Sequence, residues 1–120
     1  GVLRWFSMRW NTLVVHVNAE SNAKITLSSH KSANAGTNNL EIQIGMERNW
    51  YTHIYHNGTQ VWTKETSKIL NDSAFTSFVI SWEFNVLTFY QEGYQLPLAM
   101  YIIKHDYPFA FNFFGIRSVG

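Results

Sequence analysis

Residues 50–63 read WYTHIYHNGTQVWT, the clearest structural signal in this 120-residue chain. Asn57-Gly58 is the residue pair most typical of a two-residue hairpin turn. The residues on both sides of the pair are rich in aromatic and β-branched types, which favour strands. The segment therefore predicts a β-hairpin whose strands lie at residues 50–56 and 60–63.

Alternation of apolar and polar residues continues along the rest of the chain, which is the pattern of strands with one buried face. The clearest example is Leu40-Glu41-Ile42-Gln43-Ile44, which ends at Gly45. We expect further strands at residues 13–17, 23–28, 40–44, 75–82, 86–90, 94–103 and 109–116. A polar surface loop is expected at residues 29–39, a short helical turn at Ser67 to Leu70 and a tight turn at residues 83–85.

This series of about ten short strands has no long segment with helical periodicity and no internal repeat. Short strands separated by regular turn signals are typical of sandwiches and related all-β folds. The sequence therefore predicts an all-β fold, an antiparallel β-sandwich or jelly roll, as a single domain over residues 1–120.

Composition narrows the possible partners. Charged residues make up 14% of the chain and the net charge is +1, so nucleic acid is not predicted as a partner. The apolar runs are shorter than the roughly 18 to 20 residues that a membrane span needs. Cysteine is absent, which excludes disulfides, thiolate zinc sites and cysteine nucleophiles.

Catalytic and metal-binding patterns are weak. His53 and His56 are three residues apart on an expected strand, so their side chains point to opposite faces. The eight acidic residues do not form the pair across a cleft that glycoside hydrolysis requires. We therefore predict no catalytic residue, no metal site and no cofactor.

A binding site is predicted around Trp50 and Tyr51, where a polar loop leads into a strand that is rich in aromatic residues. A sugar is held by an aromatic ring against its C–H face and by polar side chains that fix its hydroxyl groups. Both kinds of group occur within this short segment. The predicted ligand-binding residues are Glu47, Arg48, Asn49, Trp50, His53 and Tyr55.

The aromatic content also predicts association between copies. The 20 aromatic residues are 17% of the chain, more than a small sandwich can easily bury. Near the C-terminus, Phe109, Phe111 and Phe113 fall on one face of an expected strand, with Pro108 and Phe114 towards the other. A strand that is apolar on both faces suits a subunit contact, so we predict a homo-oligomer.

Several segments, in their order and spacing, resemble one known family. They are Val17-Asn18-Ala19, Ser21 to Ser28, Leu40 to Gly45, Asn49 with Ile54, and Ile80-Ser81-Trp82. Together they resemble the farnesoic acid O-methyltransferase-like domain of invertebrates, over about Phe6 to Phe114. The chain departs from that family at residues 45–50, where the family usually has Gly-Gly-Trp-Gly-Asn. It also has Asn22 and Lys24 where the family has Asp and His.

The resemblance implies a β-sandwich, and the family name implies methyl transfer. However, a methyltransferase that binds S-adenosylmethionine usually has a Gly-rich strand-to-helix turn, which this sequence lacks. We therefore predict a protein that is not an enzyme: a lectin-like recognition module for glycans or glycoproteins. Two alternatives remain: binding or modification of a small hydrophobic, farnesoid or juvenile-hormone-like ligand, and a structural assembly subunit.

The expected location is outside the cell. Relatives that the resemblance brings in often occur in secreted or multi-domain proteins. Asn57-Gly58-Thr59 and Asn71-Asp72-Ser73 both fit the acceptor pattern for N-glycosylation, which favours a secreted protein.

Overall fold

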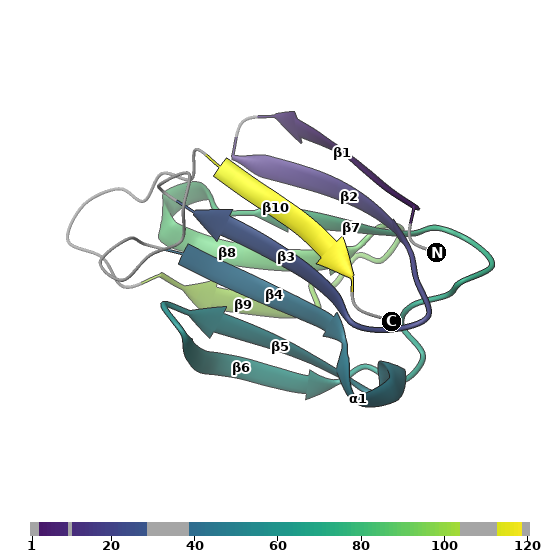
Figure 1. Ribbon diagram of the computed structural model, residues 1–120. Coiled ribbons are helices and arrows are strands. Elements are labelled where there is room, and N and C mark those ends of the chain that lie inside the picture. Colours follow the sequence, from purple (N-terminus) through teal and green to yellow (C-terminus); the bar gives the residue numbers. More distant parts are fainter. Residues whose placement is uncertain (1–2, 10, 29–38, 104–112, 119–120) are drawn as a thin grey trace.

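The computed structural model describes residues 3–9, 11–28, 39–103 and 113–118, with side chains described at 11–28 and 39–103. Two five-stranded antiparallel sheets lie face to face (Figure 1). The prediction of an all-β sandwich of about ten short strands is confirmed, while its description as a jelly roll stays a prediction.

Sheet A has the strand order β1-β2-β7-β8-β9. Its strands are β1 (Leu3–Arg9), β2 (Thr12–Asn18), β7 (Thr76–Ser81), β8 (Val86–Gln91) and β9 (Ala99–Ile102). Sheet B has the order β10-β3-β4-β5-β6. Its strands are β10 (Phe113–Ser118), β3 (Ala23–Ser28), β4 (Asn39–Gly45), β5 (Tyr51–His56) and β6 (Thr59–Glu65).

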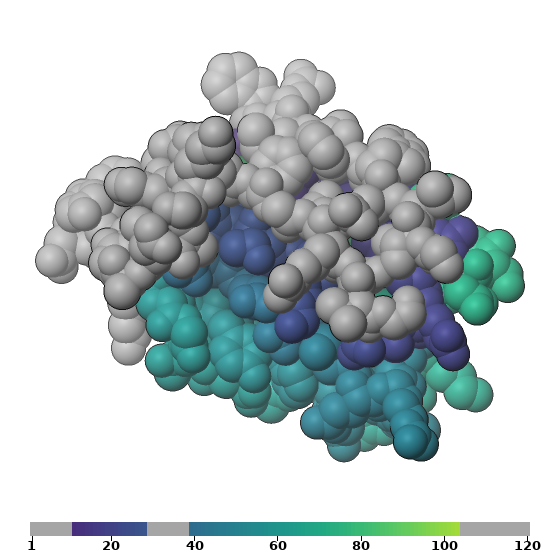
Figure 2. All heavy atoms as spheres, viewed as in Figure 1, coloured from purple at the N-terminus to yellow at the C-terminus, as the bar shows by residue number. Residues whose placement is uncertain are grey.

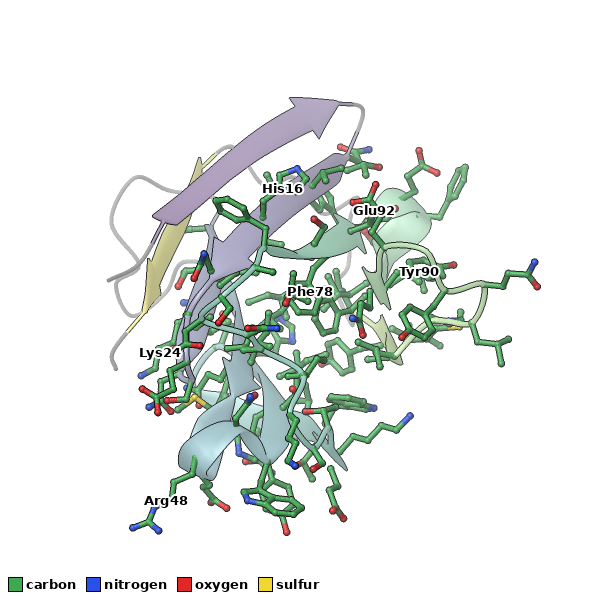
Figure 3. The ribbon with its side chains drawn as sticks, turned by 90° about the vertical axis from the view of Figure 1, so that its right-hand side faces the viewer. His16, Lys24, Arg48, Phe78, Tyr90 and Glu92 are labelled. Carbon is green, nitrogen blue, oxygen red and sulfur yellow. The ribbon has the colours of Figure 1, made fainter. Side chains whose placement is uncertain are left out.

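The core lies between the two sheets and is built by the alternation seen in the sequence. On β2, Leu13, Val15 and Val17 are buried, and the residues between them are partly exposed. Phe78 lies between the sheets (Figure 3) and stacks on Phe89 with ring centroids 5.3 Å apart. Burying one such side chain stabilises the fold by about 1.5–3 kcal/mol.

The predicted hairpin is confirmed as β5 and β6. Asn57 and Gly58 take the positive φ angles, 49° and 83°, that this turn requires. Asn57 is also tied to the start of β4, because its Oδ1 accepts a hydrogen bond from the Asn39 backbone N–H at 2.9 Å. A register shift between Ile54 and Tyr55 marks a bulge in the β5–β6 ladder.

The structure corrects several element boundaries. Strand β1 was not predicted, and the strand expected at 94–103 is limited to β9, since the segment before it contains Pro97, which lacks a backbone N–H. The expected helical turn at 67–70 is a non-helical turn. The tight turn at 83–85 is present as the 3₁₀ turn η1 (Glu83–Asn85). Residues 29–38, most of the expected loop, lie outside the described residues.

Candidate functional site

The single turn α1 (Met46–Asn49), which joins β4 to β5, has an unusual backbone. Glu47 (φ 52°, ψ 58°) and Arg48 (φ 62°, ψ 42°) are both left-handed, and Asn49 follows with φ 69°. Asparagine tolerates this conformation, but glutamate and arginine pay about 1–2 kcal/mol each for it. The surrounding structure must therefore hold the turn in place.

Asn49 provides the main attachment. Its Nδ2 donates to the Leu70 carbonyl oxygen at 2.8 Å, and its Oδ1 accepts from the Leu70 N–H at 3.0 Å. The Asn49 carbonyl also accepts from the Lys68 N–H at 2.7 Å. These bonds tie α1 to the segment that follows β6.

Gly45 provides a second attachment at the start of the turn. Its carbonyl accepts from the Asn22 N–H at 3.0 Å, which links the turn to the beginning of β3. Its φ of +65° favours glycine, and a Cβ at this position would lie 2.7 Å from Asn49 Oδ1 and 2.8 Å from Leu70 Cδ1. Both the backbone angle and the packing therefore favour glycine here.

The turn presents a group of exposed side chains. Glu47 and Arg48 are exposed, and Figure 3 shows Arg48 pointing away from the body of the protein. Trp50 is 46% exposed although its backbone is fixed, with its N–H bonded to the Met46 carbonyl and its carbonyl to the Thr66 N–H. The fixed backbone therefore presents a carboxylate, a guanidinium group and an indole ring within four consecutive residues.

The aromatic residues continue along β5 as a row, which we call the β5 row: Tyr51, His53 and Tyr55. Thr52 and Ile54, which alternate with them, are fully buried, so the row occupies the outer face of sheet B. The rings of Tyr51 and His53 are 6.2 Å apart and parallel within 6°. In Figure 2 the side chains of β4 to β6 contribute to the coloured surface below the atoms drawn in grey.

Two hydrogen bonds hold the β5 row towards β6. His53 Nδ1 pairs with Thr63 Oγ1 at 2.8 Å, and the Tyr55 hydroxyl donates to Gln60 Oε1 at 3.1 Å. These cross-strand bonds limit the rotamers of both rings, so less conformational freedom is lost when a ligand binds.

Strand β4 places planar polar groups on the other side of the row. Gln43 is paired in register with His53, and Glu41 with Tyr55. Gln43 Nε2 donates to Glu41 Oε1 at 3.1 Å. The outer face of sheet B thus combines aromatic rings with an amide and a carboxylate, the groups that can hold a polar ligand by its hydroxyls.

The predicted site residues fall into two groups. Glu47, Arg48 and Trp50 lie on the α1 turn, and His53 and Tyr55 lie on the β5 row. Asn49 differs from the prediction in its surroundings, because its amide is bonded to Leu70.

The residues predicted for the site included none from β4. The alternation of residues 40–44 already placed Glu41 and Gln43 on one strand face. Their position beside His53 and Tyr55 depends on strand order and register, which a single sequence does not reveal.

Other predictions concern metals, membranes and association. Among residues 11–28 and 39–103, no three His, Asp or Glu side chains gather closely enough to hold a metal ion. The described ranges contain no helix long and apolar enough to cross a membrane. The strand predicted as a subunit contact falls partly outside the described residues, at 108–112, and the side chains of Phe113 and Phe114 are not among those described.

The fold and this surface define a β-sandwich domain with an exposed aromatic and polar face. Comparison with protein families places the chain in one of them: the model of the farnesoic acid O-methyltransferase family matches residues 3–120. The chain therefore belongs to that family, as its motifs predicted. Comparison with curated proteins and with solved structures gives no match.

Family membership corrects one prediction. We expected a protein that is not an enzyme, but the family is described as a methyl transferase, and this points towards enzyme activity. The prediction relied on the missing Gly-rich strand-to-helix turn. That turn belongs to α/β nucleotide-binding folds, so its absence does not bear on chemistry carried by a β-sandwich.

Proposed function

We propose that the chain binds carbohydrate at the α1 turn and along the β5 row. The observation that carries this proposal is the left-handed backbone of Glu47 and Arg48, fixed by Asn49 while both side chains remain exposed. Strained backbone persists where the surrounding structure enforces it, and it is concentrated at functional sites.

The side chains of the turn suit a sugar. The exposed rings of Trp50 and Tyr51 provide apolar faces for the C–H side of a pyranose. Glu47 and Arg48 provide an acceptor and a planar donor for its hydroxyl groups. Because the backbone is already fixed, little ordering is needed on binding.

The β5 row extends this surface beyond a single sugar ring. Residues two apart on a strand are separated by about 6.5–7 Å, so Tyr51, His53 and Tyr55 offer successive positions along one line. Gln43 and Glu41 flank that line on β4. The favoured ligand is therefore a glycan chain of several units that runs along β5.

A glycan-binding role outside the cell is part of the proposal. Asn57 and Asn71, the two N-glycosylation candidates, are both exposed, which supports a secreted protein. Single shallow sugar sites bind weakly, and presenting two of them in one oligomer raises the overall affinity.

The test is binding of the purified chain to a panel of immobilised glycans, with free sugars as competitors. We expect sugar-competable binding that weakens roughly tenfold or more in Trp50→Ala, the scale of an aromatic anchor. The matched control is Phe75→Ala, because Phe75 is similarly exposed at 44% but leads into β7 of the other sheet.

Two outcomes would overturn the proposal. One is a blank panel from a folded sample, and the other is equal binding by Trp50→Ala and the unchanged chain. A third arm uses an apolar fluorophore and farnesoic acid as its competitor. Displacement there, with a blank glycan panel, would favour the farnesoid-binding alternative.

A further inference from the structure

Strand β9 differs from the other three edge strands of the sandwich. Strands β1, β10 and β6 each contain charged residues: Arg4 and Arg9, Arg117, and Lys64 and Glu65. Strand β9 reads Ala-Met-Tyr-Ile and has none. Charged residues on edge strands discourage edge-to-edge pairing, so β9 is the described edge that lacks this protection.

The outer side of β9 is also apolar and exposed. Met100 is 63% and Ile102 is 69% exposed, whereas Ala99, on the opposite side of the strand, is buried. Tyr101 also points inward, because its hydroxyl bonds to His56 Nδ1 at 2.9 Å. The two exposed residues therefore lie on the same face of the strand.

Phe84 continues this apolar surface at one end of β9. Its turn is attached to the end of that strand through the Ile103 N–H, which donates to the Asn85 carbonyl at 2.7 Å. Phe84 is left-handed (φ 55°, ψ 33°) and 96% exposed. A bulky residue in this conformation is strained. Because the ring of Phe84 is exposed to water, no burial within the chain offsets this strain.

The exposed area is close to what a stable interface needs. Tyr94 and Leu96 lie in the segment that leads into β9, and both are exposed. Aromatic side chains carry about 150–250 Å² each, and the aliphatic ones are somewhat smaller. At the exposed fractions given, these two with Phe84, Met100 and Ile102 therefore expose on the order of 600 Å². A standard interface buries about 800 Å² per partner. These five side chains are uncharged, and the exposed Glu83 and Glu92 lie beside Phe84 and Tyr94 at the border of the surface.

We propose that two copies of this chain associate through β9, in antiparallel pairing about a twofold axis at Tyr101. Residues one step on either side of the axis then face each other, so Met100 of one copy lies opposite Ile102 of the other. The pattern is self-complementary, as a twofold interface requires. The edge hydrogen bonds of β9 find partners, and Phe84 is covered at the border of the contact.

This dimer leaves the proposed sugar surface free. The β5 row lies on the outer face of sheet B, whereas the pairing uses an edge of sheet A. Each dimer therefore carries two copies of the β5 row. The dimer does not depend on the sugar proposal, and either can fail without the other.

The test is sedimentation of the full chain between about 1 and 100 μM, with circular dichroism to verify folding. We expect a concentration-dependent dimer. Ile102→Lys places a charge on the edge strand and should raise the dissociation constant tenfold or more. Because Ile102 is exposed, the monomer should keep its fold, and Met100→Lys serves as a second variant at the same surface.

Phe84→Asn separates the contribution of Phe84 to the dimer from its effect on the stability of the monomer. Asparagine tolerates the left-handed backbone, so the monomer should unfold at higher urea concentration while dimerisation weakens. The control variant is Trp50→Ala, which should sediment like the unchanged chain. Amide hydrogen exchange of residues 99–102 should slow as protein concentration rises.

Three results would overturn the proposal. The first is a species of the monomer mass, 14.0 kDa, at every concentration tested. The second is a dimer whose dissociation constant is the same in Ile102→Lys, Met100→Lys and the unchanged chain. The third is a dimer that Trp50→Ala disrupts, which would place the contact on sheet B.

Discussion

The side chain of Asn49 and the backbone of Leu70 are joined by two hydrogen bonds, of 2.8 and 3.0 Å, across 21 positions of the sequence. The Asn49 amide thus satisfies both the N–H and the carbonyl of Leu70, as a neighbouring strand would do, although Leu70 lies outside the sheets. This pair holds the left-handed α1 turn together with the backbone hydrogen bonds from Asn22 N–H to Gly45 and from Lys68 N–H to Asn49.

Asn49→Ala should therefore destabilise the protein and loosen the turn. Two hydrogen bonds of about 0.5–1.5 kcal/mol each are lost, and alanine tolerates the left-handed backbone less well than asparagine. We expect a loss of about 2–3 kcal/mol in the free energy of unfolding by urea. Asn71→Ala is the control, since Asn71 is exposed and its side chain bonds only to the nearby Ser73 N–H. Equal losses in the two variants would contradict the role assigned to Asn49.

Arg48→Gly should have the opposite effect on stability. Glycine adopts φ of 62° without the steric penalty that arginine pays. We expect the free energy of unfolding to rise by about 1 kcal/mol and glycan binding to weaken, because a donor is removed. A gain in stability with a loss of binding is the signature of strain retained for function.

The control for Arg48→Gly is Lys64→Gly, at an exposed position in the regular strand β6. There glycine should lower stability, since it loses more chain entropy on folding. If both variants are destabilised by a similar amount, the turn at residues 46–49 is not strained in solution.

The sequence allowed the β5–β6 hairpin to be predicted, because Asn57-Gly58 encodes its turn locally. The α1 turn could not be predicted in this way. Glutamate and arginine rarely adopt positive φ, so residues 46–49 do not indicate a left-handed turn. The turn is held by the hydrogen bonds between Asn49 and Leu70, which are 21 positions apart, so no local pattern reveals them. For the same reason the sequence could point to residues 47–55 as a candidate site, which stays a prediction, but not to Glu41 and Gln43, whose place beside His53 and Tyr55 depends on strand register.

Gly45→Ala separates steric packing from backbone strain. The new Cβ would lie 2.7 Å from Asn49 Oδ1, so it would displace the amide that fixes the turn. Gly93→Ala is a matched control, because Gly93 also has a positive φ (92°) but no atom within 4 Å of a new Cβ. We expect Gly45→Ala to lose about 1–3 kcal/mol more unfolding free energy than Gly93→Ala. Similar losses would mean that only the backbone angle matters at Gly45.

The contact between Tyr101 and His56 connects the two sheets and predicts a response to alkaline pH. Desolvation by burial raises the pKa of the Tyr101 hydroxyl above its usual value of 10.0. The folded state then holds this proton more tightly than the unfolded state. The stabilisation that comes from this pKa difference is fully present below about pH 10 and is lost as the pH rises through the pKa of Tyr101 in the folded state.

Urea unfolding between about pH 8 and 11.5 tests this response. We expect the free energy of unfolding to fall above pH 10, and to fall less steeply in Tyr101→Phe, which has no proton to lose. Tyr94→Phe is the control, because the side chain of Tyr94 is exposed; its alkaline slope should match that of the unchanged chain. Identical slopes in all three proteins would mean that Tyr101 is not desolvated in solution, and that the edge where β9 meets β5 is more open than its hydrogen bond to His56 implies.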